Sequence, residues 1–445
     1  MSDRKRVAWR EGMFLRPQHF QAQDRYIDSL IAARHGWTQP YSWGFSEIKL
    51  DEGLAELGQV GIASAKGIMP DGTPFSIPGD IAAPPSLTVD SQTRDAIVYL
   101  TIPTRQAGMQ EFAEKDTGSL DARYLVELTR LNDNFSDERT EEEIELGTAN
   151  LRLGITPNET QGRILLGIKK IREVSGKKLV FDDRYIPPVV DIRASRLRSA
   201  LSDLIGRQRQ MSDELAITAA ETAEGGQDAF RAFNLLQTLN RWGPVLDHMA
   251  AMPTIHPERM YENLCSLAGE VSTLMREERR PPEFPEYDHE NLQATFDPVI
   301  TLLQVMLSGR IERLATQLEL RLLSPGQYMH VNSNPAQLKQ SHLFLAVAAE
   351  RIALEDIQKR FPSIAKVGPN TKMPQLIQSN LPGIPLRYEP TPPSQIRVLQ
   401  GHVYFEIDRR SKEWDEITQA PALGLFVSDA WPGLKIELWA VKQRS

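Results

Sequence analysis

The strongest constraint in this sequence is a change in the spacing of its apolar residues at about Asp191. From there to residue 315, apolar side chains recur in alternating steps of four and three, which places them on one side of a helix. Four such stretches follow one another, and each forms a seam that can pack against a neighbouring helix at a shallow angle. The sequence therefore predicts a four-helix bundle over residues 188–315. The residues that we expect to form the seam of this bundle, within one chain or between subunits, are Leu197, Leu201, Leu204, Leu235, Leu239, Trp242, Leu292, Phe296, Val299 and Leu303.

Turn-forming residues mark the ends of these predicted helices. Pro187-Pro188 precede the first helix, and Asp191 is suited to its N-cap. Gly225-Gly226 separate the first helix from the second, and Pro257 is suited to the first position of the third. Connections of this length favour antiparallel neighbours.

Residues 1–187 show a different pattern, in which short apolar runs are separated by turn residues. Apolar and polar residues alternate over Ile144–Leu146 and over Leu151–Ile155, which predicts strands that bury one face. Pro70-Asp71-Gly72-Thr73-Pro74 is a typical turn sequence. Many short strands without helical patterns between them favour a β-sandwich over residues 1–187.

Residues 316–445 mix the two patterns and predict an α/β head domain. Val403–Ile407 and Leu434–Trp439 alternate as strands, whereas Glu355–Phe361 has the spacing of a short helix. Gln317–Leu322 fits either a strand or the end of a helix. The fold class is therefore multidomain α+β, with a sandwich, a helical bundle and a head in that order.

Composition excludes several classes of function. The chain has 51 Lys and Arg against 59 Asp and Glu, a net charge of −8, so nucleic acid is not expected as a partner. The net charge is unevenly distributed along the chain: residues 316–445 carry a net +3 and residues 1–315 a net −11. A single cysteine, Cys265, suits a reducing compartment, and neither a signal peptide nor a membrane span is apparent. We expect a cytoplasmic protein without direct membrane insertion.

Sequence motifs for catalysis or cofactor binding are missing. Gly67–Pro74 has the glycine spacing of a phosphate-binding loop, but Thr73 stands where a lysine is required, so we expect a hairpin turn. The eight histidines never occur in the spacing that places two metal ligands on one helical face. Cys265 lies beside Leu264 and is expected to be a small buried residue. We expect no enzyme activity, cofactor or metal.

The N-terminal segment is unusually apolar for a chain end. Trp, Met, Leu and two Phe fall within the thirteen residues Trp9–Gln21, and the amphipathic stretch Asp24–Ile31 that follows predicts a short helix. Such a segment must be buried, either as a lid on its own sandwich or at an interface with another chain.

The same segment carries a family resemblance. The string Trp9-x-x-Gly12-Met13-Phe14-Leu15-x-Pro17-Gln18-His19-Phe20-Gln21, followed by Asp24-Arg25-Tyr26, resembles the N-terminal signature of the TssK (ImpJ) family, a baseplate component of bacterial type VI secretion systems. The order of sandwich, helices and head also resembles that family along the whole chain.

The resemblance implies a non-enzymatic homotrimeric adaptor. The sandwich would be a shoulder like that of phage receptor-binding proteins and would dock on the wedge proteins TssF and TssG. The helical neck would trimerise, and the head would contact TssL and TssM of the TssJLM membrane complex, holding the protein at the periphery of the inner membrane. We place the wedge interface at Trp9, Met13, Phe14, Pro17, His19 and Phe20. Candidates for the head interface, most of them expected in the core, are Tyr404, Phe405, Trp414, Phe426, Trp431 and Trp439.

Two other classes of function stay open at this point. One is a free-standing trimeric receptor- or carbohydrate-binding protein of phage type. The other is a hydrolytic enzyme whose site lies between sandwich and head. Glycan binding by the head would favour the first, and a bound metal or cofactor would favour the second.

Overall fold

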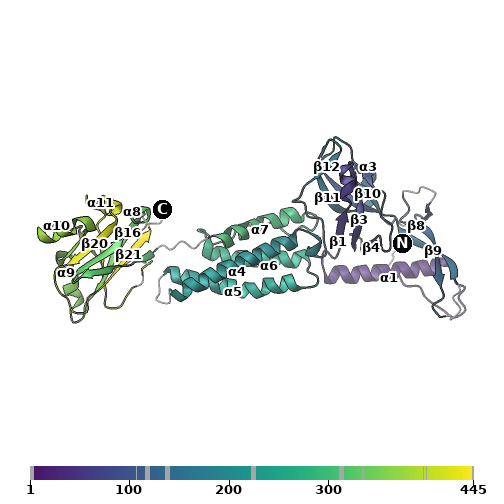
Figure 1. Cartoon of the computed structure of the whole chain (residues 1–445). Helices are drawn as coiled ribbons and strands as arrows, with labels where there is room; N and C mark the ends of the chain where they lie inside the picture. Colours follow the sequence, from purple (N-terminus) through teal and green to yellow (C-terminus); the bar gives the residue numbers. More distant parts are fainter. Residues whose placement is uncertain are drawn as a thin grey trace. The chain divides into compact units, whose positions relative to one another are not determined.

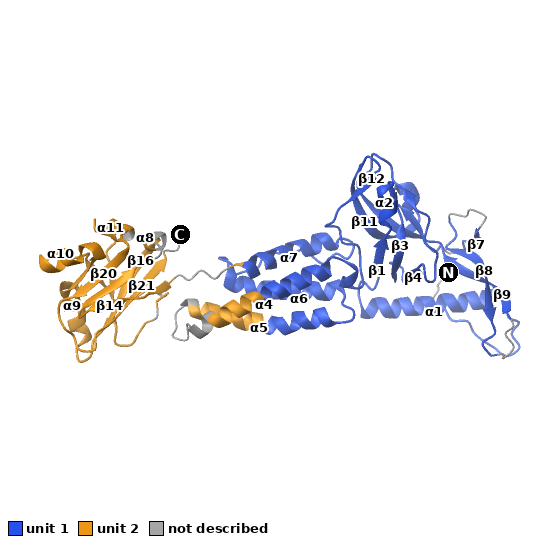
Figure 2. Ribbon diagram, viewed as in Figure 1, with its two compact units in different colours: residues 1–209, 241–308 blue, residues 210–240, 309–445 orange. Residues whose placement is uncertain are grey.

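A computed structural model gives the fold of the chain. It describes residues 5–106, 108–115, 121–135, 141–221, 227–309, 315–332, 335–393, 395–396 and 398–442. The fold is mixed α+β, as the sequence predicts (Figure 1). The chain divides into two compact units, residues 1–209 with 241–308 and residues 210–240 with 309–445 (Figure 2). The domain limits predicted at residues 187 and 315 stay a prediction.

The first element is a long helix, α1 (Pro17–Thr38), which extends well beyond the short helix predicted over Asp24–Ile31. Pro17 occupies the first turn, where its missing N–H costs nothing. The backbone N–H of Arg16 donates to Nδ1 of His19 at 3.1 Å, which fixes the start of the helix. None of its residues is buried.

Two sheets follow α1 in the first unit. Three strands pair antiparallel in the order β1-β3-β4: β1 (Gly44–Leu50), β3 (Ile62–Ile68) and β4 (Pro74–Ile77). Four strands pair in the order β10-β6-β11-β12: β6 (Arg94–Pro103), β10 (Arg152–Gly154), β11 (Arg163–Ser175) and β12 (Lys178–Phe181). Alternate residues Val98, Leu100 and Ile102 of β6 are fully buried, which is the period-two pattern of a strand with one face in the core.

Short elements lie between these strands, and two of them, β2 (Gln59–Val60) and β5 (Leu87–Thr88), pair as a separate two-stranded sheet. The predicted hairpin at Gly67–Pro74 is confirmed, because it joins β3 to β4 and Gly72 takes the left-handed conformation that its turn requires. The remaining pieces are α2 (Glu52–Glu56) and α3 (Pro157–Thr160).

A further three-stranded sheet projects from this unit, and it corrects one prediction. Its strands are β7 (Phe112–Glu114), β8 (Tyr124–Asn132) and β9 (Glu141–Ala149). Ile144 and Leu146 alternate as predicted, but both are exposed, so β9 does not bury a face within the chain. Periodicity identifies the strand, whereas burial depends on what packs against it.

Four helices come next: α4 (Leu197–Glu221), α5 (Gln227–Ala251), α6 (Pro257–Met275) and α7 (Leu292–Ser308). Polar side chains tie neighbours together: Arg209 of α4 pairs with Asp247 of α5 at 2.7 Å, and Gln304 of α7 donates to Asp203 of α4 at 2.9 Å. Trp242 Nε1 of α5 donates to Glu270 of α6 at 3.0 Å. The helices thus lie side by side.

The predicted helix ends are partly correct. Pro257 opens α6 as expected, and His256 caps that helix through Nδ1. Asp191 is not the N-cap of α4: its carboxylate accepts from the N–H of Arg193 and caps a 3-10 turn, Ile192–Ala194, that precedes the helix. The predicted break at Gly225-Gly226 lies outside the described residues.

The second unit contains two sheets that share a large apolar core, with a smaller apolar cluster beside it. Five strands have the order β13-β21-β16-β19-β18: β13 (Ala315–Leu318), β16 (Ser341–Ala348), β18 (Leu386–Glu389), β19 (Val403–Ile407) and β21 (Lys435–Lys442). Four strands have the order β14-β15-β20-β17: β14 (Arg321–Ser324), β15 (Gln327–Val331), β17 (Ala365–Pro369) and β20 (Ala422–Val427). The ambiguous segment Gln317–Leu322 thus resolves into parts of two strands.

Short helices flank these sheets: α8 (Pro335–Gln340), α9 (Leu354–Ile364), α10 (Met373–Gln378) and α11 (Trp414–Gln419). The core between them centres on Phe361 and Phe405, whose rings stack at 5.3 Å. Among the described residues, no helix is both long and apolar enough to cross a membrane.

Candidate functional site

The N-terminal segment forms an exposed aromatic cluster at the start of α1. The ring of Trp9 lies 6.2 Å from that of His19 and 6.2 Å from that of Phe20. A turn closed by a hydrogen bond from Met13 N–H to the carbonyl of Arg10 brings residues 9–13 back towards the helix. We call Trp9, Met13, Phe14, Pro17, His19 and Phe20 the N-terminal cluster.

Most of this cluster faces solvent. Phe14 is 80 % exposed, Phe20 52 % and Trp9 50 %, whereas Met13 and His19 are half-buried. The segment therefore does not act as a lid buried on its own sheets, which was one of the two alternatives left by the sequence. Large apolar groups gathered in this way are typical of a surface that another chain covers.

The other end of α1 is held by two stacked histidines. His256 and His289 lie 5.3 Å apart with ring planes 12° apart. Nε2 of His256 donates to the carbonyl of Tyr41 at 3.0 Å, and Nε2 of His289 donates to the carbonyl of Trp43 at 2.8 Å. Both carbonyls belong to the linker between α1 and β1, so the histidines clamp the point from which α1 projects.

Hydrogen bonding and burial keep these histidines neutral. Nδ1 of His256 accepts the N–H of Glu258, and Nδ1 of His289 lies 2.8 Å from the Tyr287 hydroxyl, which donates to it. Burial lowers the pKa of His256 and lowers that of His289 to about 4. No spacing pattern in the sequence indicates this pair, because His256, at the start of α6, and His289, just before α7, meet only in the folded chain.

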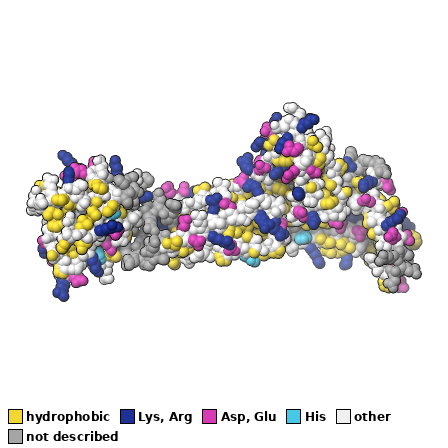
Figure 3. Space-filling model, viewed as in Figure 1, with side chains coloured by type: hydrophobic (Ala, Val, Ile, Leu, Met, Phe, Trp, Pro, Cys, Tyr) yellow, Lys and Arg dark blue, Asp and Glu magenta, His cyan; other side chains and the backbone are white. Residues whose placement is uncertain are grey.

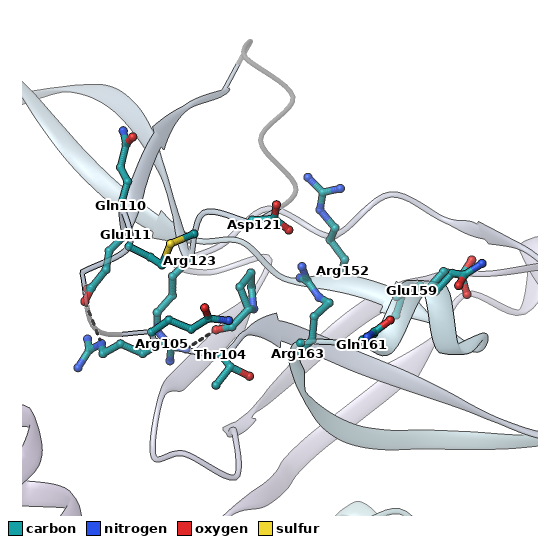
Figure 4. Close-up of a pocket in the computed structure, with 16 residues that line it drawn as sticks. Thr104, Arg105, Gln110, Glu111, Asp121, Arg123, Arg152, Glu159, Gln161 and Arg163 are labelled. Atoms are coloured by element: carbon teal, nitrogen blue, oxygen red, sulfur yellow. Dashed lines mark hydrogen bonds and ion pairs between the residues drawn. The ribbon is translucent and has the colours of Figure 1, made fainter.

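A cleft of about 500 Å³ in the first unit is lined by arginines (Figure 4). Arg105 pairs with Asp28 of α1 and with Glu111, each at 3.4 Å, and Arg123 pairs with Asp71. Burial and the neighbouring charge of Arg152 lower the pKa of Arg163 to about 10. These ion pairs fasten α1 and the β3–β4 turn to the sheets, and they involve two of the four arginines that line the cleft.

The predicted seam residues lie in the interior of the single chain. All ten are buried, none more than 5 % exposed. Contact between subunits along the helices would therefore use side chains other than these.

The predicted head residues are mostly inaccessible too. Tyr404, Phe405, Trp414 and Trp431 are buried, as expected for core residues. Phe426 and Trp439 are half-buried and keep some surface free. The structure brings Phe405, Trp414 and Trp431 together in one apolar core.

Groups that could support chemistry are few. Over the described residues, no three His, Cys, Asp or Glu side chains approach closely enough to hold a metal ion. Cys265 is half-buried and its pKa is raised by burial, so its thiol is a poor nucleophile.

Comparison with known proteins gives one consistent result. Residues 19–441 match a family described as "Bacterial Type VI secretion, VC_A0110, EvfL, ImpJ, VasE". The chain is 35 % identical over 445 residues to the type VI secretion system baseplate component TssK1 of Pseudomonas aeruginosa, covering 99 % of this chain and 100 % of that protein.

Solved structures agree with this match. A crystal structure of TssK is 30 % identical with a TM-score of 0.68 and covers 99 % of this chain and all of that one. A chain in a structure of the TssK-TssF-TssG baseplate subcomplex is 24 % identical, with a TM-score of 0.61, covering 68 % of this chain and 99 % of that chain; this likeness shows the fold alone.

Proposed function

Because the chain belongs to the TssK (ImpJ, VasE) family of type VI secretion baseplate components, we propose that it works as a trimeric adaptor. One end grips the TssF–TssG wedge, and the other binds TssL and TssM of the membrane complex at the inner membrane. The parts of the adaptor are a β-sandwich shoulder over residues 1–187, a four-helix-bundle neck over 188–315 and a head over 316–445. The related TssK in the TssK-TssF-TssG subcomplex supports the wedge as partner.

The observation that carries this proposal is the exposed N-terminal cluster. Phe14 and Phe20 present rings to solvent at the start of a helix whose other end is clamped by His256 and His289. A clamped helix offers its aromatic end at little cost in conformational entropy, which favours tight docking. Aromatic anchors of this kind commonly supply most of the energy of an interface.

The apolar core of the head supports the proposal that the head binds a second partner. Its two sheets enclose an apolar core of their own, with Lys366 buried and bound to the carbonyls of Leu376 and Leu381 at 3.2 and 2.8 Å. A head with its own core can hold a partner without help from the shoulder. Three copies would then add avidity to contacts that are weak one at a time.

The wedge contact is tested with a pair of double variants. F14A/F20A removes two exposed rings of the cluster, and F230A/F233A removes two rings of similar exposure, 69 % and 58 %, from α5. Capture of purified TssF–TssG should fall more than tenfold for the first variant and stay unchanged for the second, with equal circular dichroism. If F14A/F20A binds the wedge as the parent does, the docking assignment is wrong.

The two-ended arrangement is tested with the same variants. Capture of the cytoplasmic parts of TssL and TssM should be unaffected by F14A/F20A, because the head core does not involve these residues. Light scattering of the parent chain should give the mass of three copies. A mass of one copy would contradict the trimer.

A further inference from the structure

Two apolar surfaces of the first unit are left uncovered besides the aromatic cluster. The first runs along α1, where Ile27 and Ile31 are 42 % and 58 % exposed. Their spacing of four places them on one side of the helix. Figure 3 shows apolar side chains gathered over this helix. We call Ile27 and Ile31 the helix stripe.

The second surface is one face of the projecting sheet. Thr129 pairs with Ile144 and Glu127 with Leu146, and Leu131 lies on the same face two residues beyond Thr129. Leu131, Ile144 and Leu146 are between 40 and 43 % exposed. We call these three residues the hairpin face.

A sheet of this size is not expected to stay uncovered. Small sheets need an apolar face packed on another layer to be stable in water. Among the described residues, none lies over the hairpin face closely enough to bury it, and the same is true of the helix stripe. Both surfaces therefore need a cover from outside the described residues.

The charges around the two surfaces are complementary. Residues 5–38 carry six Lys and Arg against three Asp and Glu, a net +3. Residues 124–132 and 141–149 carry one Arg against five Glu, a net −4. Of these glutamates, Glu127 and Glu142 lie on the hairpin face itself. Glu127 pairs with Lys115, and Glu143, on the opposite face, pairs with Arg130.

Arg34 is well placed to use this charge. It follows Ile31 by three residues on the same side of α1, and it has no ion pair among the described residues. Glu142 stands opposite Leu131 on the hairpin face and is likewise without an ion pair in the described part of the chain. An apolar stripe flanked by a cation thus matches an apolar face flanked by an anion.

We propose that the helix stripe of one copy docks on the hairpin face of a second copy of this chain. The two surfaces are different, so the contact is head to tail and generates a ring when the rotation closes. This inference rests on the proposed trimer and adds the surfaces that would build it, which lie outside the buried helical seam.

Mixed cross-linking tests the head-to-tail geometry. In a C265A background, one chain carries I31C and the other L146C, and a short bismaleimide reagent is added after the two are mixed and allowed to exchange. A covalent dimer should form in the mixture and in neither variant alone. Cross-linking of I31C to itself, or no dimer in the mixture, would overturn the proposal.

Mass measurement separates this inference from the trimer itself. I27D/I31D and I144K/L146K should each reduce the mass about threefold, from three copies to one, without loss of circular dichroism, because the replaced residues are exposed in the single chain. V398D, an exposed apolar residue of the head, serves as the matched control. If the parent and both double variants are trimers, these surfaces are wrong but the trimer stands; a monomeric parent overturns both.

Discussion

Helix α1 and the helices α4–α7 use the same kinds of apolar residue in opposite ways. In α7, Leu292, Phe296 and Val299 are fully buried within the chain. In α1, Phe20, Ile27 and Ile31 repeat at equally helical spacing, yet no residue of that helix is buried. Helical periodicity therefore identifies a contact surface in both places, but the partner is in the same chain for α7 and is supplied by another chain in our proposals for α1.

The largest effect that would test this difference is on stability. Phe296 packs edge-on against Tyr261 with ring centroids 5.5 Å apart. F296A should lower the free energy of unfolding by about 3–5 kcal/mol, because it leaves a cavity in the core. F14A should change it by less than about 0.5 kcal/mol, because that ring is already in water. Urea unfolding of both variants measures the contrast, and equal losses would show that Phe14 is part of a core.

A comparable change in the free energy of unfolding is expected when the pH is lowered, because of the stacked pair His256 and His289, which we call the histidine clamp. The pKa of His289 is lowered from its ordinary value of 6.5 to about 4 in the folded chain. Between these values the unfolded chain binds the proton and the folded chain does not, so stability falls as the pH falls from 6.5 to 4, by up to about 3 kcal/mol.

Urea midpoints at pH 7 and pH 4.5 measure this loss. The H289Q variant should lose this part of the pH dependence, whereas H248Q, which changes an exposed histidine, should retain it. An H289Q profile that matches the parent would mean that the clamp does not titrate as the structure implies.

A smaller effect is expected at the start of α1. Nδ1 of His19 accepts the backbone N–H of Arg16, so H19A should weaken the first helical turn by about 1 kcal/mol. Amide hydrogen exchange should speed up in residues 16–20 and not in α7. H35A, near the other end of the same helix, is the matched control. Unchanged exchange in the first turn would show that this cap is dispensable.

The smallest effect concerns the exposed cross-strand pair of Arg130 and Glu143, which lie 3.1 Å apart. E143Q should cost less than about 0.5 kcal/mol, because water screens an exposed ion pair. Both residues lie on the sheet face opposite the hairpin face, so the loss should be the same in the parent assembly and in the I27D/I31D variant; a loss of more than about 1 kcal/mol in the parent alone would show that this second face is covered as well when copies associate.

Several elements follow from local sequence alone. The seam of α4–α7, the hairpin at Gly67–Pro74 and the strand Val403–Ile407 are each set by spacing or turn chemistry, which act over a few residues. Asp191 shows the limit of such reasoning. It is a capping residue, as predicted, but it caps a 3-10 turn that precedes the expected helix.

The candidate site was only partly predictable. Trp9, Phe14 and Phe20 stand out in the sequence because large apolar residues before the first strand require a cover. The histidine clamp could not be found in this way, since His256 and His289 acquire their roles from two carbonyls of a distant linker. The charge match between α1 and the projecting sheet was equally hidden, because it depends on which faces remain exposed.

Residue types and their spacing were enough to predict the family, the mixed α+β class and the positions of the apolar faces. The tertiary structure decided which of these faces are filled from within the chain. It buried the seam of α7 and the rings of the head, and it left α1 and the face of β9 open. The physical reason is that burial is a property of what packs against a residue, and the neighbours of a helix or strand come from distant parts of the chain.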